Sequence, residues 1–132
     1  MNRVVHFEIH ADNPERAIAF YSAIFGWEIQ KWESDSMEYW MVMTAPKEST
    51  EPGINGGLLR RPAPLPSLDQ GSNAFVCTMQ VDNFDETSKK ILDSGGHVAM
   101  PKFAIPKMAW QGYFLDTEGN TFGVHQPDVN AA

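Results

Sequence analysis

The sequence predicts an α+β fold in which the order strand, helix, strand, strand, strand occurs twice. The main observation is a repeat at a spacing of 70 residues, in which Asp12-Asn13 recurs as Asp82-Asn83 and Trp40 recurs as Trp110. In both halves a strand-like run precedes the Asp-Asn pair, an amphipathic helix follows it, and a glycine ends the helix. A short unit that occurs twice pairs with its copy to bury its apolar face. Two sheets packed in this way leave a groove, where we expect the functional site.

Length and composition favour one globular domain. The 132 residues are interpreted as a single domain, 1–132, with module one at about 3–61, a proline-rich linker at 62–72 and module two at about 73–127. A net charge of −7 argues against nucleic acid and anionic membranes as partners, since both need basic patches. Cys77 is the only cysteine, which favours a reducing, cytoplasmic compartment. No apolar stretch is long enough to span a bilayer.

Local patterns predict each element of the first half. Residues 3–10 alternate between apolar and polar side chains, as in a strand with one buried face. Asn13 and Pro14 predict the start of a helix that ends at Gly26. The apolar stripe of this helix is assigned to Ala17, Tyr21, Ile24 and Phe25. Three further strands are predicted at 27–32, 38–44 and 54–60, with a loop at 45–53.

The second half repeats this order. A strand is predicted at 75–81, with Phe75, Cys77, Met79 and Val81 facing the second helix. That helix is capped by Asp82 or Asn83, carries Phe84, Ile91 and Leu92 on its apolar stripe, and ends at Gly95-Gly96. A short strand at 97–100, a loop at 101–107, a strand at 109–115, a turn at 116–119 and a last strand at 120–126 complete the chain.

Strand alternation also predicts which side chains face the groove. Each helix buries its stripe on the apolar face of its sheet, so His6, Glu8 and His10 lie on the opposite face. By the same alternation Thr78, Gln80 and His125 lie on the groove face of the second half. For the strand at 38–44 two assignments stay open, with either Tyr39, Met41 and Met43 or Trp40 and Val42 toward the groove.

Two stretches resemble the vicinal oxygen chelate superfamily, which includes glyoxalase I, extradiol dioxygenases and bleomycin-resistance proteins. They are residues 12–17 (DNPERA) with Phe20-Tyr21 and Phe25-Gly26-Trp27, and the closing run at 116–123 (DTEGNTFG). The similarity extends from Val4 to Gln126. It implies paired βαβββ modules forming an open, U-shaped, barrel-like cleft, and a homodimer.

The resemblance also implies positions for metal ligands on strands that face the cleft. These positions fall on His6, Val76, Gly123 and about Leu58, and only His6 among them can coordinate a metal. No cofactor is firmly predicted from this set. A divalent metal held by His6 together with Glu8, His10 or His125 stays open as an alternative.

We predict that the protein binds a small apolar or aromatic molecule and acts as a glyoxalase-related lyase or isomerase. Glu8 is the candidate general base, because a desolvated carboxyl group suits proton transfer, and His6 orients it. The alternative for Glu8 is a structural ion pair with Arg60, Arg61 or a histidine. The candidate ligand-binding residues are His10, Thr78, Gln80, His125, Tyr39 and Met41. Two alternatives to an enzyme are a drug-sequestering protein of the bleomycin-resistance type and a regulatory dimer with a vestigial cleft.

Overall fold

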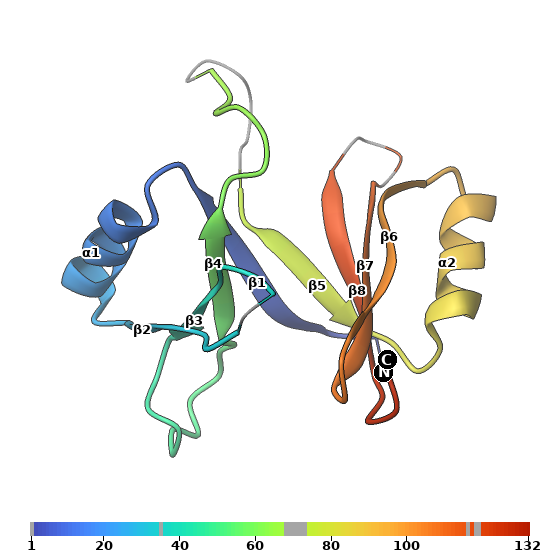
Figure 1. Cartoon of the computed structure of the whole chain (residues 1–132). Coiled ribbons are helices and arrows are strands. Elements are labelled where there is room, and N and C mark those ends of the chain that lie inside the picture. Colours follow the sequence, from blue (N-terminus) through green and yellow to red (C-terminus); the bar gives the residue numbers. More distant parts are fainter. Residues whose placement is uncertain (1, 35, 68–73, 116, 118–119) are drawn as a thin grey trace. The chain divides into compact units, whose positions relative to one another are not determined.

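A computed structural model describes residues 2–34, 36–67, 74–115, 117 and 120–132. It confirms the α+β class and the predicted order of two βαβββ modules (Figure 1). The elements are β1 (Val4–Ala11), α1 (Pro14–Phe25), β2 (Glu28–Lys31), β3 (Trp40–Met43), β4 (Gly56–Arg60), β5 (Val76–Gln80), α2 (Phe84–Asp93), β6 (His97–Ile105), β7 (Ala109–Leu115) and β8 (Thr121–Pro127). The hydrogen-bonded strand order is β2-β3-β4-β1-β5-β8-β7-β6.

The chain divides into two compact units, which we describe separately. His6–Phe75 is called module one, and Val76–Ala132 together with the first five residues is called module two. The backbone carbonyl of Arg3 accepts a hydrogen bond from the amide of Gln80, which joins this N-terminal segment to β5. None of the described helices is long and apolar enough to cross a membrane.

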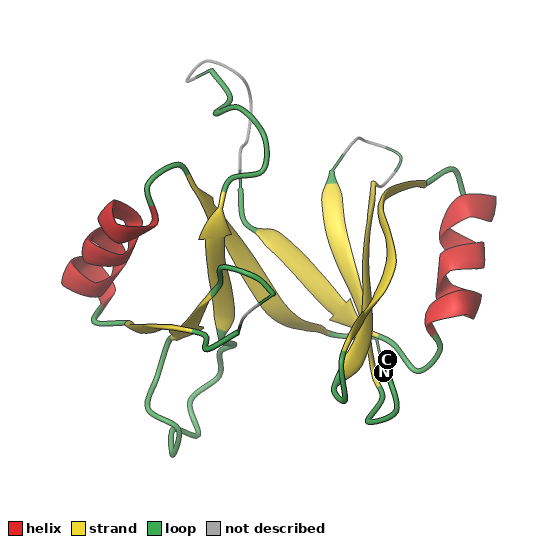
Figure 2. Ribbon diagram, viewed as in Figure 1, coloured by secondary structure: helices red, strands yellow, loops and turns green. Residues whose placement is uncertain are grey.

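In module one, α1 packs on one face of the strands β2-β3-β4-β1 (Figure 2). β1 is parallel to β4, and β3 is antiparallel to both of its neighbours, β2 and β4. The buried core consists of Phe7, Ile9, Ala11, Trp40, Val42 and Leu58. The core therefore takes alternate residues of β1 and β3, which leaves the other residues of these strands on the face opposite α1.

Helix α1 has the predicted ends but a different buried stripe. The Asn13 side chain accepts a hydrogen bond from the Arg16 amide, and Gly26 closes the helix with a φ of 69°. Ile24 and Phe25 were predicted to be part of the apolar stripe, and this is wrong, since both are more than half exposed. The predicted Ala17 and Tyr21 do pack against the core, together with Ile18, and Pro14 is buried. Ile24 and Phe25 lie in the last turn of α1.

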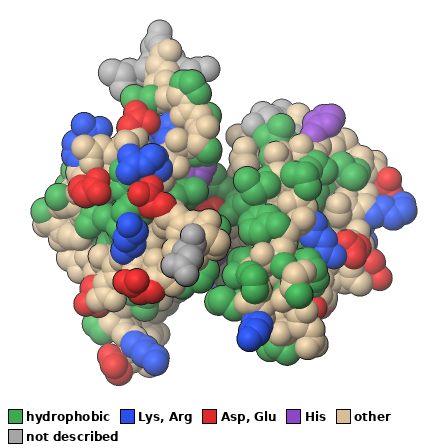
Figure 3. Space-filling view, in the orientation of Figure 1, with side chains coloured by type: hydrophobic (Ala, Val, Ile, Leu, Met, Phe, Trp, Pro, Cys, Tyr) green, Lys and Arg blue, Asp and Glu red, His purple; other side chains and the backbone are tan. Residues whose placement is uncertain are grey.

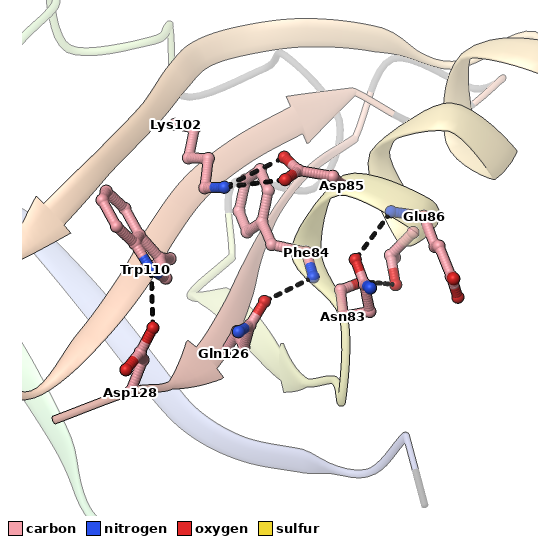
Figure 4. A network of polar contacts seen from close by, with 9 residues as sticks. Asn83, Phe84, Asp85, Glu86, Lys102, Trp110, Gln126 and Asp128 are labelled. Carbon is pink, nitrogen blue, oxygen red and sulfur yellow. Dashed lines mark hydrogen bonds and ion pairs between the residues drawn. The ribbon is translucent and has the colours of Figure 1, made fainter. Parts of the chain in front are cut away.

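In module two, α2 packs on the strands β5-β8-β7-β6. β5 is parallel to β8, and β7 pairs antiparallel with β6 and β8. Two side chains hold the start of α2, since Asn83 accepts from the Glu86 amide and Gln126 Oε1 accepts from the Phe84 amide (Figure 4). The core contains Val81, Phe84, Phe114 and Val124.

Three other details of the second half differ from the sequence prediction. The segment 101–107 was predicted to be a loop, but β6 continues from His97 through to Ile105. Phe75 was predicted to face α2, but it packs in module one, where its ring centroid lies 5.5 Å from that of Phe7. Leu92 was placed on the buried stripe of α2, but it is 47% exposed. The predicted linker residues 68–72 and most of the turn at 116–119 lie outside the described residues.

Candidate functional site

The face of β1 opposite α1 carries His6, Glu8 and His10, as the alternation predicts. Phe7 and Ile9 belong to the core, so the three polar side chains lie on the other side of the strand. Glu8 is only 6% exposed, whereas His6 and His10 are half-buried. In the parallel register Glu8 pairs with Gly57 of β4. The carboxyl group therefore has a glycine as its direct neighbour on this face.

Gly57 makes room for a side chain that arrives from the next strand. Its neighbour on the other side is Met41 of β3. Just before β3, the Tyr39 side chain extends over Gly57, and its hydroxyl lies 2.8 Å from Nε2 of His6. A Cβ atom at position 57 would collide with the Tyr39 hydroxyl oxygen and ring. The structure thus places Tyr39 and His6 together across an intervening strand.

The core residues of β3 show which face of that strand lies on the same side of the sheet as His6, Glu8 and His10. Trp40 and Val42 are in the core, so Tyr39, Met41 and Met43 occupy the opposite face. Met41 is 40% exposed. The ring of Trp32 meets the Tyr39 ring edge-on, with 6.3 Å between the centroids. Aromatic and thioether groups therefore lie beside the hydrogen-bonded His6.

Burial keeps both histidines of this face in their neutral form. The pKa of His6 is lowered from its ordinary value, because desolvation by burial outweighs the opposing charge of Glu8. The pKa of His10 is lowered by the same desolvation, which Glu8 opposes and the nearby Arg61 guanidinium reinforces. Neutral imidazole has one donor and one acceptor nitrogen. At pH 7 both side chains can therefore accept a proton.

Two arginines at the end of β4 are tied to other groups of module one. The Arg60 guanidinium pairs with Glu38 at 3.1 Å. Arg61 donates from Nη2 to the His10 carbonyl at 3.0 Å, and its Nε lies 3.6 Å from a carboxylate oxygen of Asp12. These contacts fix the backbone at His10, next to the buried Glu8.

In module two the predicted residues Thr78 and His125 lie on the face opposite α2, near a glutamine that sequence reasoning missed. Nδ1 of His125 and Oε1 of Gln111 are 2.8 Å apart, and Gln111 is 5% exposed. Thr78 is 1% exposed and pairs in register with Gly123, whereas Gln80 is exposed. The available signal was a polar residue within the apolar run of β7, which the sequence analysis did not use.

The residues at the positions implied for a metal do not fit a divalent cation. Leu58 was placed at a ligand position facing the cleft, and this is wrong, because it is fully buried in the core of module one. Gly57 is the residue of β4 that neighbours Glu8, and it has no side chain. Nε2 of His6 is engaged by the Tyr39 hydroxyl. Among the described residues no three His, Cys, Asp or Glu side chains group together as metal ligands.

Comparisons with known proteins agree with the predicted resemblance. Residues 3–45 match the family model of the bleomycin resistance protein-like N-terminal domain. A hypothetical protein from Bacillus halodurans C-125 has a similar structure, with a TM-score of 0.64 and 12% identity over 99% of this chain and 98% of that chain. None of the curated proteins compared matches the sequence.

Methylmalonyl-CoA epimerases are also similar in structure. The enzyme from Streptomyces coelicolor aligns with a TM-score of 0.63 and 15% identity, over 100% of this chain and 99% of that chain. The Mycobacterium tuberculosis enzyme aligns with a TM-score of 0.61 and 15% identity, over 95% of this chain and 87% of that chain. Methylmalonyl-CoA epimerase is a vicinal oxygen chelate superfamily member, so this chain has the fold that the resemblance implies.

Proposed function

We propose that this chain, which has the fold of the vicinal oxygen chelate superfamily, binds a small apolar or aromatic molecule at the His6–Glu8–His10 face of module one and moves a proton on it. The observation that carries the proposal is the buried carboxyl group of Glu8 between two imidazoles that burial keeps neutral. A carboxyl group and a neutral imidazole in one site can accept a proton and return it.

The proposed reaction is proton transfer at a carbon next to a carbonyl group. Glu8 takes the proton as the C–H bond breaks, and the electron pair moves onto the carbonyl oxygen to form an enolate. Glu8 then returns the proton to a carbon atom, which completes an isomerisation. Glu8 and His6 are the catalytic residues in this proposal.

Tyr39 holds the His6 ring in position for this reaction. The Tyr39 hydroxyl forms a hydrogen bond with Nε2 of neutral His6, which fixes the orientation of the ring. His10 and Met41, on the same face, are the proposed ligand contacts of module one.

Deuterium incorporation tests this proposal even when the product has not been identified. The protein is incubated in D₂O with methylmalonyl-CoA, with phenylpyruvate or with the glutathione hemithioacetal of methylglyoxal, and loss of the C–H signal is followed by NMR. Methylmalonyl-CoA is included because methylmalonyl-CoA epimerases have a similar structure. Phenylpyruvate is included because it carries an aromatic ring next to the exchanging C–H group. We expect exchange above the buffer rate with at least one probe.

Two variants make the test specific. Glu8→Gln should slow exchange about a hundredfold or more, because a positioned acid or base contributes that much, and it should leave the thermal shift caused by the same probe in place. Glu38→Gln is the matched control, since among the described residues the Glu38 carboxylate pairs with Arg60, in an exposed contact on the same module. Equal rates for Glu8→Gln and the unaltered protein would refute the catalytic role.

A second candidate function is sequestration without turnover. The match to the bleomycin resistance protein-like family model and the exposed Met41 near Trp32 and Tyr39 favour it. Thioether and aromatic groups adapt to flat ligands. Sequestration would be supported over the enzyme by two results together. Bleomycin should raise the melting temperature and be recovered unchanged, and none of the three carbon acids should exchange.

We also propose that the protein acts as a homodimer in the cytoplasm. Hydrophobic side chains gather on the surface of module two that Figure 3 shows, and module two exposes Val98, Met100 and Met108 by about half. An exposed apolar surface is typical of an interaction site. The free thiol of Cys77 suits a reducing compartment. Light scattering of the protein should give twice the chain mass of 14.8 kDa. The Val98→Lys variant should give the mass of a single chain.

A further inference from the structure

Two rows of side chains cross module two on the face opposite α2. Residues that pair in register point to the same side of a sheet. One row consists of Thr78, Gly123, Tyr113 and Met100, and the next consists of Gln80, His125, Gln111 and Phe103. Gly123 therefore contributes no side chain to the first row, between Thr78 and Tyr113.

Two polar groups converge above this glycine. A Cβ atom at position 123 would collide with Oγ1 of Thr78 and would lie 3.0 Å from Nε2 of Gln111. The hydroxyl and the amide nitrogen therefore both lie close to the point where a side chain at position 123 would begin. His125 fixes the orientation of Gln111, because its Nδ1 binds Oε1 at 2.8 Å and leaves Nε2 toward Gly123.

The Thr78 hydroxyl is the unusual member of this group. It is buried, and it has no hydrogen-bond partner among the described residues. Buried hydroxyl groups in folded proteins almost always have a partner, because an unpaired one loses its hydration without compensation. A ligand atom above Gly123 would supply the missing partner.

We propose that Thr78 Oγ1 and Gln111 Nε2 form a binding subsite for a carbonyl or carboxylate oxygen. The amide nitrogen is only a donor and the hydroxyl can donate, so the ligand atom that satisfies both is an acceptor. Tyr113 and Phe103 lie next to this position in the two rows and provide an apolar surface for the rest of the ligand. The subsite lies within module two and does not depend on the acid–base role of Glu8.

The test follows the side-chain amide signals of Gln111 in ¹⁵N-labelled protein, assigned by their loss in Gln111→Leu. The three probes are benzoate, acetophenone and toluene, which carry a carboxylate, a carbonyl and no acceptor. We expect a saturable shift of the Gln111 signals with benzoate, acetophenone or both, and none with toluene. The probe that binds more tightly identifies the group. No shift with either acceptor, or the same shift with toluene, would overturn the subsite.

Thr78→Val separates a binding hydroxyl from a structural one, because valine has the same shape without the hydroxyl. We expect Thr78→Val to raise the melting temperature and to weaken probe binding about two- to tenfold, the contribution of one hydrogen bond. Thr44→Val is the matched control, since Oγ1 of Thr44 donates to the Ile54 carbonyl at 2.7 Å. It should lower the melting temperature and leave probe binding unchanged. A Thr78→Val protein that loses stability as Thr44→Val does, with unchanged affinity, would overturn the proposal.

Glu8→Gln distinguishes this proposal from the one for module one. The Glu8→Gln protein should keep the Gln111 shifts and lose deuterium exchange. Failure of the subsite would leave the dependence of exchange on Glu8 intact, and failure of the catalytic proposal would leave the Gln111 shifts intact.

Discussion

The Tyr39 hydroxyl lies 2.8 Å from Nε2 of His6, although 33 positions separate the two residues in sequence and one strand separates them in the sheet. The strand between them is β4, and it places Gly57 between Glu8 of β1 and Met41 of β3. Any side chain at position 57 would occupy the space of the Tyr39 ring. The contact between Tyr39 and His6 at the proposed site therefore requires a glycine at position 57 of β4.

Gly57→Ala should break the contact between Tyr39 and His6. The added Cβ atom collides with the tyrosine ring, so the ring must leave its position. We expect a loss of about 1–3 kcal/mol in the free energy of unfolding, as for other overpacked sites, and reduced deuterium exchange. Urea unfolding and the exchange assay measure the two effects. Gly53→Ala is the control, because its Cβ atom would meet nothing within 4 Å; equal losses in both variants would contradict this account.

Tyr39→Phe tests the hydroxyl alone. Phenylalanine keeps the ring beside Trp32 and removes the hydrogen bond to His6. The free energy of unfolding should fall by about 0.5–1.5 kcal/mol, the usual net contribution of one hydrogen bond. The ¹⁵N signals of the His6 ring should change, because Nε2 loses its partner. Unchanged ring signals together with unchanged stability would show that the hydrogen bond has no part in positioning His6.

The two neutral histidines, His6 and His10, should make the folded protein less stable at acidic pH. Burial lowers the pKa of both His6 and His10 below the ordinary value of 6.5. The unfolded chain therefore binds more protons than the folded one as pH falls below that value, and folding stability decreases with it. The contribution is complete above about pH 6.5 and is lost as the pH falls through the folded-state values.

NMR titration of the imidazole C–H signals checks this directly. Both midpoints should lie below 6.5, and Glu8→Gln should lower them further, because the Glu8 charge favours the protonated imidazoles. Urea unfolding at pH 7.5 and at pH 5 gives the stability difference. A midpoint above 6.5 for either histidine would contradict the burial of that side chain in solution.

Much of the fold could be predicted because its signals are local. The alternation in β1 and the helix caps at Asn13 and Asn83 depend on neighbours in sequence, and the structure has all three. The position of Tyr39 beside His6 could not be predicted, because it depends on the order β3-β4-β1. Alternation placed Tyr39 with Met41, but only the register with Gly57 decides which face they share.

The strand β6 shows how a local signal can mislead. Pro101 has no amide hydrogen to donate, which favours a loop in a sequence read alone. β6 is the last strand of the sheet, and a proline is tolerated on such an edge. The pairing with β7 shifts register between Met100 and Phe103, around the proline. The strand then continues and brings Lys102 over the core of module two.

Lys102 should contribute more to stability than an exposed lysine of the same module. Its Nζ lies 3.0 Å from both carboxylate oxygens of Asp85 and 4.7 Å from the centroid of Trp110 (Figure 4). Lys102→Met keeps the aliphatic chain and removes the charge, and we expect it to cost about 1 kcal/mol, since a partly buried cation over an aromatic ring contributes that much. Lys89→Met, which breaks only the exposed pair with Asp93, should cost under about 0.5 kcal/mol. Urea unfolding in low and in high salt measures the stability cost of both variants. The cost of Lys102→Met should persist in high salt. Equal costs for the two variants that both shrink in high salt would show that the aromatic contact contributes nothing.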